Sequence, residues 1–230
     1  MLLIIAPRHD QAAVSLATLW GSRSAMLLTA RDLSEPGWKF EVPPSGPSRL
    51  IASGRAFSSD EVSGVLTRLP AVYESELSHV VLPDRSYMSS EMTAFLLAWL
   101  SSLACPVLNR PTPGCLCGPS WRLEQWVHLA AELGIPVVPV RRSTSPATPD
   151  QADGGFTVTV VGGRCVGAVH ASLAAYARSL AAAAQVDLLG VQFTTPDSRG
   201  RLQSVSLCPD ISSLEIADAI LEYFDSRAPC

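Results

Sequence analysis

The chain has 230 residues, of which 47% are hydrophobic and 17% charged, and its formal net charge is -4. This composition excludes a disordered chain, which would hold fewer apolar and more charged residues. It also argues against nucleic acid as a partner, because a phosphate backbone must be neutralised by clustered cations and the largest arginine cluster is the pair Arg141-Arg142. Lys39 is the only lysine among the 17 basic residues.

The apolar stretches of the chain are too short for targeting or for membrane insertion. The N-terminal run Met1–Ala6 is broken by Pro7 too early for a signal peptide. The longest apolar stretch, residues 93–108, is shorter than the roughly 20 residues that span a bilayer. We therefore expect a cytoplasmic protein with no membrane partner, whose cysteines are mostly reduced, with Cys105 in the core.

The N-terminal residues predict a βαβ unit. Leu2–Ala6 is a continuous apolar run, Asp10–Trp20 repeats its apolar residues at helical spacing, and Ala25–Thr29 is again short and apolar. Short apolar runs of this kind are typical of parallel strands that are buried on both faces.

The same criteria place the remaining elements. Helices are predicted over residues 89–103, 120–133, 171–184 and 213–226, and strands over 38–42, 49–52, 62–68, 105–109, 135–140, 156–161, 165–169, 188–194 and 202–207. The Gly162-Gly163 pair between two strands predicts a β-hairpin. Residues 141–155, rich in Ser, Thr, Pro, Asp and Gly, are the one linker-like stretch. The order of elements indicates an α/β protein.

Several of these segments resemble the ATP-grasp ligases, especially the graspetide synthetases that modify peptides. Residues 84–139, with Asn109-Arg110-Pro111 after a strand, resemble the front half of that fold, and Leu66–Pro70 is similar to a strand end of the same branch. Three later segments, 158–164, 187–193 and 204–209, look like its closing part.

The resemblance implies two domains. Residues 1–110 would form an N-terminal Rossmann-like, pre-ATP-grasp domain, and residues 111–230 a C-terminal α+β ATP-grasp-like subdomain. In the family, a lid subdomain of several dozen residues lies between the two halves and clamps the nucleotide. Here only the linker 141–155 stands in that place, and Lys39 lies too early in the chain to replace the lysine of the lid. We therefore expect a protein without a lid.

The closing segments also depart from the family pattern. That pattern has an acidic residue in a Gly-Val-Asp-Phe-like strand and a Glu-x-Asn pair in the next strand, and this chain has Gln192, Ser204 and Ser206 there. Magnesium ions need oxygen ligands with carboxylate charge, and phosphoryl transfer depends on that metal. The resemblance thus implies a degenerate ATP-grasp protein, for which no cofactor is expected.

Four residues are candidates for ligand binding. Asn109 and Arg110 follow a strand and could bind an anionic group, since the guanidinium of arginine offers a forked pair of donors. Arg68 corresponds by resemblance to a substrate-side strand end, and Ser120 would open a helix whose free N–H groups favour an anion. The alternatives are salt bridges for the arginines and a simple N-cap for Ser120.

The cysteines form a further candidate. Cys115-Leu-Cys117 could bind a metal together with Cys208, or form a redox pair with Cys165 or Cys208. The Cys-x-x-Cys spacing of a zinc site is missing, which favours ordinary thiols and no metal.

These observations lead to three hypotheses for function. The first is a non-catalytic ATP-grasp-like protein that acts as a binding or accessory partner in the maturation of a ribosomally made peptide. The second is an enzyme with a repurposed cleft that uses Cys115, Cys117, Cys208 and Arg110. The third is one half of a composite ATP-dependent carboxylate–amine ligase. A peptide or protein partner is expected, and a cleft without a lid also favours a homodimer or a hetero-complex.

Overall fold

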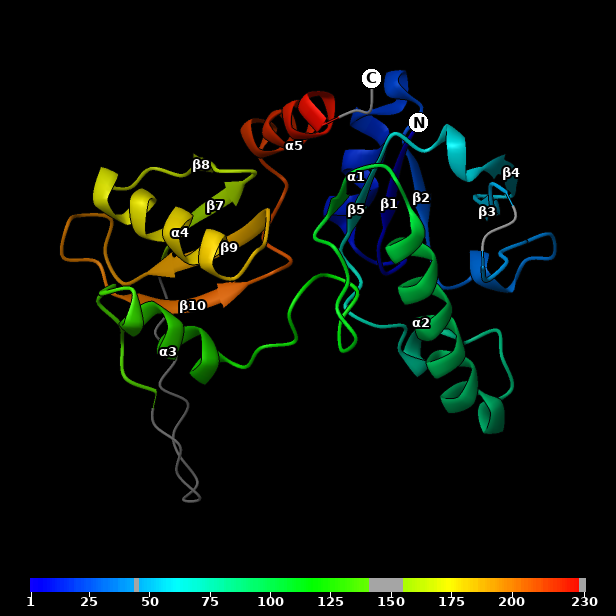
Figure 1. The fold of residues 1–230 in the computed structure, drawn as a ribbon, viewed down its shortest axis with the longest axis horizontal. Coiled ribbons are helices and arrows are strands. Elements are labelled where there is room, and N and C mark those ends of the chain that lie inside the picture. Colours follow the sequence, from blue (N-terminus) through cyan, green and yellow to red (C-terminus); the bar gives the residue numbers. More distant parts are fainter. Residues whose placement is uncertain (44–45, 141–154, 228–230) are drawn as a thin grey trace. The chain divides into compact units, whose positions relative to one another are not determined.

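A computed structural model describes residues 1–43, 46–140 and 155–227 (Figure 1). The chain divides into two compact units. The first unit is Met1–Pro119 together with the stretch that begins at Ile211, and the second unit is Ser120–Asp210. The expected domains, 1–110 and 111–230, instead place the C-terminal helix with the second half of the chain. The expected linker lies outside the described residues except for Gly155.

The first unit is built on a parallel sheet with the strand order β2-β1-β5-β6. These strands are β1 (Leu2–Ile5), β2 (Met26–Leu28), β5 (Gly64–Thr67) and β6 (Val107–Leu108). All residues of β1 and β5 are buried, as the continuous apolar runs predict. Helix α1 (Gln11–Leu19) connects β1 to β2, so the predicted βαβ unit is confirmed.

Helix α2 (Arg85–Ser102) supplies most of the helical part of the core of this unit, through Met92, Leu96, Trp99 and Leu100. The start predicted for this helix, at residue 89, is wrong. The helix begins four residues earlier, because the 3-10 turn Leu82–Asp84 leads directly into it, and the N-cap position makes no side-chain hydrogen bond.

A hairpin of β3 (Arg49–Ala52) and β4 (Arg55–Ser58) completes the strands of the first unit. Strand β4 was not predicted. The strand predicted over residues 38–42 is reduced to a single bridge between Lys39 and Arg49. Short 3-10 turns connect these elements, at Gly21–Arg23, Asp32–Ser34, Ser59–Glu61 and Glu74–Glu76.

Helix α5 (Leu214–Arg227) packs on this unit through its aromatic residues. A Cβ atom added at Gly64 in β5 would lie 2.6 Å from the ring of Phe224, so the ring rests directly on the strand backbone. Arg23 and Asp225 form an ion pair at 2.8 Å. These contacts explain why the last helix belongs to the first unit.

The second unit is built on an antiparallel sheet with the order β10-β9-β7-β8. Its elements are β7 (Phe156–Val161), β8 (Arg164–Val166), β9 (Leu188–Phe193), β10 (Leu202–Ser206), α3 (Leu123–Glu132) and α4 (Ala171–Ala183). The predicted hairpin at Gly162-Gly163 is confirmed. The strand predicted over residues 135–140 forms only one parallel bridge, between Val137 and Leu202. Within the described residues, no helix combines the length and apolar character needed to cross a membrane.

Candidate functional site

The carboxyl edge of the parallel sheet gathers polar residues from distant parts of the chain. Strands β1 and β5 run parallel, so the residues that follow Ile5 and Thr67 meet at one edge, where open α/β sheets bind ligands. The Nε atom of Arg68 lies 2.7 Å from Oδ2 of Asp10, and these side chains are 9% and 14% exposed. Oδ1 of Asp10 accepts the N–H of Ala13 and caps α1. Arg68 is thus placed at the expected edge and is paired with an acid.

A second carboxylate, that of Glu76, stabilises the same β1–α1 turn. Its side chain is 7% exposed, and Oε1 lies 3.6 Å from Nδ1 of the exposed His9. Oε2 accepts the N–H of Arg8 at 3.3 Å. The sequence did not mark Glu76 as a candidate, because it lies in a polar turn with no pattern of its own.

Asn109 is buried directly after β6 and holds the following loop. Its Nδ2 atom donates to the carbonyl of Cys117 at 3.2 Å. Within that loop the Thr112 hydroxyl donates to the carbonyl of Gly118, and Thr112 and Cys115 form a bridge. Asn109 therefore fixes the position of the Cys115–Cys117 loop at the sheet edge.

The guanidinium of Arg110 points back toward the turn that precedes β6. It donates to the carbonyls of Leu103 and Cys105, each at 3.1 Å. These two hydrogen bonds join Arg110 to backbone carbonyls, whereas the alternative considered from the sequence was a surface salt bridge. A guanidinium has five N–H donors, so an anion at Arg110 would have to use the donors that these carbonyls leave.

The prediction that Ser120 begins a helix is wrong. Helix α3 starts at Leu123, and the N-cap position is Arg122, whose N–H donates to Oε1 of Gln125 at 2.9 Å. Gln125 fills the side-chain half of a capping box and so sets the start of the helix. Ser120 lies before this start, in the second unit, whereas Arg68, Asn109 and Arg110 belong to the first.

The Cys115–Cys117 loop contains two buried thiols. The Cys117 N–H donates to Sγ of Cys115 at 3.4 Å. The Cys117 thiol has two acceptors in reach, Sγ of Cys115 and the Thr67 carbonyl at 3.4 Å. The hydrogen bond from the Cys117 side chain is the main cause that lowers the pKa of Cys115 to about 6, against the opposing effect of burial. The hydrogen bond from Cys117 therefore favours the thiolate form of Cys115.

The surroundings of this loop differ from those of the other cysteines. The Thr67 hydroxyl is buried, and it has no hydrogen-bond partner among the residues that the structure describes. Burial raises the pKa of the Cys105 and Cys165 thiols. Cys208, the third member of the suggested metal set, lies in the second unit. Among the residues that the structure describes, no group of three or more His, Cys, Asp or Glu side chains is placed to hold a metal ion.

In the second unit, Gln192 on β9 faces Ser204 on β10. The two residues are paired in the antiparallel register, and the Ser204 hydroxyl donates to Oε1 of Gln192 at 2.6 Å. The Gln192 side chain also packs on the backbone of Gly155, where an added Cβ atom would lie 2.3 Å away. Ser206 pairs with Gly190, and its hydroxyl accepts the N–H of Cys208 at 3.2 Å. The structure thus brings Gln192 and Ser204 together as a neutral pair.

Comparison with known proteins finds similarity in structure only. No protein-family model matches the chain, and no curated protein matches it. The macrocyclase MdnB from Microcystis aeruginosa MRC superposes with a TM-score of 0.70 at 14% identity, over 97% of this chain and 99% of that one. The macrocyclase MdnC of the same organism, bound with the precursor peptide MdnA, gives a TM-score of 0.69 at 11% identity and the same coverage.

A third solved structure is also similar to this chain. It is a RiPP-associated ATP-grasp ligase from Chryseobacterium gregarium in complex with ADP and a leader and core peptide, with a TM-score of 0.68 at 11% identity over 99% of this chain and 97% of that one. The chain has an ATP-grasp-like fold. This fold confirms the resemblance at the level of architecture, with a parallel sheet in one unit and an antiparallel sheet in the other.

Proposed function

We propose that this ATP-grasp-like protein is a non-catalytic binding or accessory partner in the maturation of a ribosomally made peptide. The observation that carries the proposal is the hydrogen bond between Ser204 and Gln192. By resemblance, these positions belong to the acidic residues that bind magnesium in the ligases. An amide and a hydroxyl that satisfy one another bring no negative charge to the site.

The energetics of phosphoryl transfer support this proposal. Magnesium ions are held by oxygen ligands that include carboxylates, and the reaction proceeds mainly through electrostatic stabilisation by metal ions and basic groups. Neutral side chains at positions 192 and 204 would weaken the binding of magnesium. They would therefore also weaken the electrostatic stabilisation of the transition state of phosphoryl transfer. The short stretch between Val140 and β7, and the lack of any lysine after Lys39, further support the absence of the nucleotide lid of the family.

The similar structures support a peptide as the partner. MdnC is bound with a precursor peptide, and the Chryseobacterium ligase with a leader and core peptide. In this chain we assign the peptide to the carboxyl edge of the parallel sheet, at Arg68, Asn109 and Arg110. Ser120 is left out of this assignment, because the helix that it was expected to open begins at Leu123.

The test is calorimetric titration of the full chain with ATP in the presence of magnesium, with a catalytic ATP-grasp ligase as the positive control. We expect no magnesium-dependent binding of ATP at millimolar concentration. The variant Gln192→Asp/Ser204→Glu restores two carboxylates, and we expect it to gain weak magnesium binding that Gln192→Asn/Ser204→Thr does not. Tight, magnesium-dependent ATP binding by the unmodified chain would overturn the proposal.

A further inference from the structure

A cavity lies at the amino edge of the parallel sheet in the first unit, away from Arg68 and Asn109. Its volume is about 380 Å³, and Val62, just before β5, and Cys105, just before β6, both line it. A cavity of this size is in the range of small-molecule and side-chain pockets. Neither the resemblance nor the proposed function assigns a role to it.

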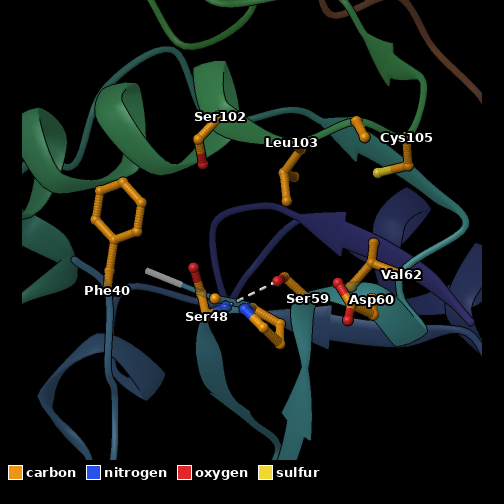
Figure 2. A pocket seen from close by; sticks show the side chains of 11 residues that line it. Phe40, Ser48, Ser59, Asp60, Val62, Ser102, Leu103 and Cys105 are labelled. Atoms are coloured by element: carbon orange, nitrogen blue, oxygen red, sulfur yellow. Dashed lines mark hydrogen bonds between the residues drawn. The ribbon is translucent and has the colours of Figure 1, made fainter. Parts of the chain in front are cut away.

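The two main walls of the cavity come from separate segments. Figure 2 shows the side chains of Ser102 and Leu103, at the end of α2, facing Ser48 and Ser59 across the cavity. Phe40 lies toward one end of the cavity and the thiol of Cys105 toward the other. The cavity therefore has an apolar lining with hydroxyl groups on both walls.

The hydrogen bonds of these walls leave acceptors available. The Ser102 hydroxyl donates to the carbonyl of Trp99 at 2.7 Å, so its oxygen can still accept. The Ser59 oxygen accepts the N–H of Ser48 at 2.9 Å. Within the part of the chain that the structure describes, the exposed carboxylate of Asp60 makes no hydrogen bond or ion pair. Asp60 is also the one charged side chain among the eleven described residues of the lining.

On the other wall, the Arg110 guanidinium offsets the partial negative charge at the end of helix α2, because it donates to the carbonyls of Leu103 and Cys105. The last carbonyls of a helix lack partners within the helix, and its C-terminus carries a partial negative charge. Two cations of the chain already bind carbonyls nearby, the Arg110 guanidinium at Leu103 and Cys105 and the Met1 ammonium at Glu61. Both are held by backbone oxygens, and neither is paired with the carboxylate of Asp60.

We propose that this cavity binds the basic side chain of an arginine or lysine presented by a peptide. The methylene stem would pack on Phe40, Val62 and Leu103, as long basic side chains do on apolar surfaces. The cationic head would reach the carboxylate of Asp60. The inference rests on the proposed function only for the source of the side chain, because a peptide is the partner proposed there.

The experiment uses two capped pentapeptides of the full sequence glycine-alanine-X-alanine-glycine, in which X is arginine or its neutral isostere citrulline. Binding to the full chain is followed by the backbone amide NMR signals. We expect the arginine peptide to shift the signals of Ser59, Asp60 and Ser102, and the citrulline peptide to bind about fivefold more weakly. Equal affinity for the two peptides, or shifts confined to other residues, would overturn the proposal.

Matched variants test the role of the carboxylate. Asp60→Asn removes the charge at constant size, so affinity for the arginine peptide should fall about fivefold and the preference over citrulline should vanish. Asp218→Asn makes the same change on the exposed face of α5 in the same unit and should leave binding unchanged. An Asp60→Asn variant that binds the arginine peptide as well as the unmodified chain contradicts the proposal.

A third variant tests the cavity itself. Ser102→Phe fills the space between the walls and should abolish binding of both peptides, while the dispersed NMR spectrum reports whether the chain is still folded. If folded Ser102→Phe binds like the unmodified chain, the site is not this cavity. The outcome is separable from that of the proposed function, because ATP binding would refute that function and leave the arginine preference unaffected.

Discussion

Each sheet has a pair of polar side chains, and the donor–acceptor distances of the two pairs are nearly equal. One pair is charged and the other is neutral. At the edge of the parallel sheet, Arg68 and Asp10 are both charged and mostly buried at 2.7 Å. In the antiparallel sheet, Gln192 and Ser204 are neutral and lie 2.6 Å apart. A buried charge needs its partner, whereas a half-buried amide that loses its partner can bind water. The comparison shows that the mostly buried pair of the first unit is an ion pair, whereas the pair of the second unit carries no charge.

The largest effect is expected from breaking the charged pair. Arg68→Met should lower the free energy of unfolding by about 3 kcal/mol, because the Asp10 carboxylate is left uncompensated. Urea unfolding measures the change. Adding Asp10→Asn removes the stranded charge while keeping an N-cap acceptor, and it should recover part of the loss.

The matched control for that prediction is Arg23→Met. It breaks the ion pair with Asp225, whose partners are 49% and 55% exposed, and should cost less than about 1 kcal/mol. Equal losses for Arg68→Met and Arg23→Met would mean that burial does not distinguish the two pairs.

The thiol pair at the same sheet edge should respond with a smaller change in stability and a clear change in titration. Cys117→Ala removes the thiol that donates to Cys115, so the pKa of Cys115 should rise from about 6 toward its ordinary value. The rate of alkylation of Cys115 as a function of pH, followed by mass spectrometry, gives the midpoint. Cys117→Ser keeps a donor and should keep the midpoint low, and an unchanged midpoint in Cys117→Ala would contradict this assignment.

The same pKa fixes the sign of a pH effect on folding. The folded pKa of Cys115 lies below the unfolded value, so the thiolate contributes stability that is complete above the ordinary thiol pKa and is lost as the pH falls through about 6. The difference in stability between the unmodified chain and Cys115→Ser should therefore be larger at pH values near 8 than near 5.

The smallest effect is expected from the neutral pair. Ser204→Ala should lower the free energy of unfolding by about 1 kcal/mol or less, since Gln192 is only partly buried and can bond to water. Ser204→Thr keeps the hydroxyl and serves as the control in the same urea experiment. A loss as large as that of Arg68→Met would show that the neutral pair is a structural element comparable with the charged one.

Local sequence patterns predicted a helix or strand well where the residues of that one element determine its structure. The buried runs of β1 and β5, the Gly162-Gly163 hairpin and helix α4 all follow from the spacing of apolar residues or from a turn. The errors occur where side-chain capping or pairing between strands decides. The hydrogen bond to Gln125 sets the start of α3 after Ser120. Val137 forms a single bridge where a strand was predicted.

The same distinction, between local patterns and contacts made in the tertiary structure, applies to the candidate site. The sequence by itself determined that neutral residues occupy positions 192 and 204, that Lys39 stands alone, and that Arg68, Asn109 and Arg110 follow strands. Only the tertiary structure decided what those side chains bind.

The physical reason lies in the range of each effect. Apolar periodicity depends on neighbours within one helix or strand, and it is therefore present in the sequence. The partner of a polar side chain depends on strand order, which joined Arg68 to an aspartate 58 residues earlier in the chain. The carbonyl partners of Arg110, by contrast, are local, since Leu103 and Cys105 lie 7 and 5 residues earlier in the chain. The cavity beside Asp60, which no sequence pattern had indicated, again combines segments that are far apart in the chain.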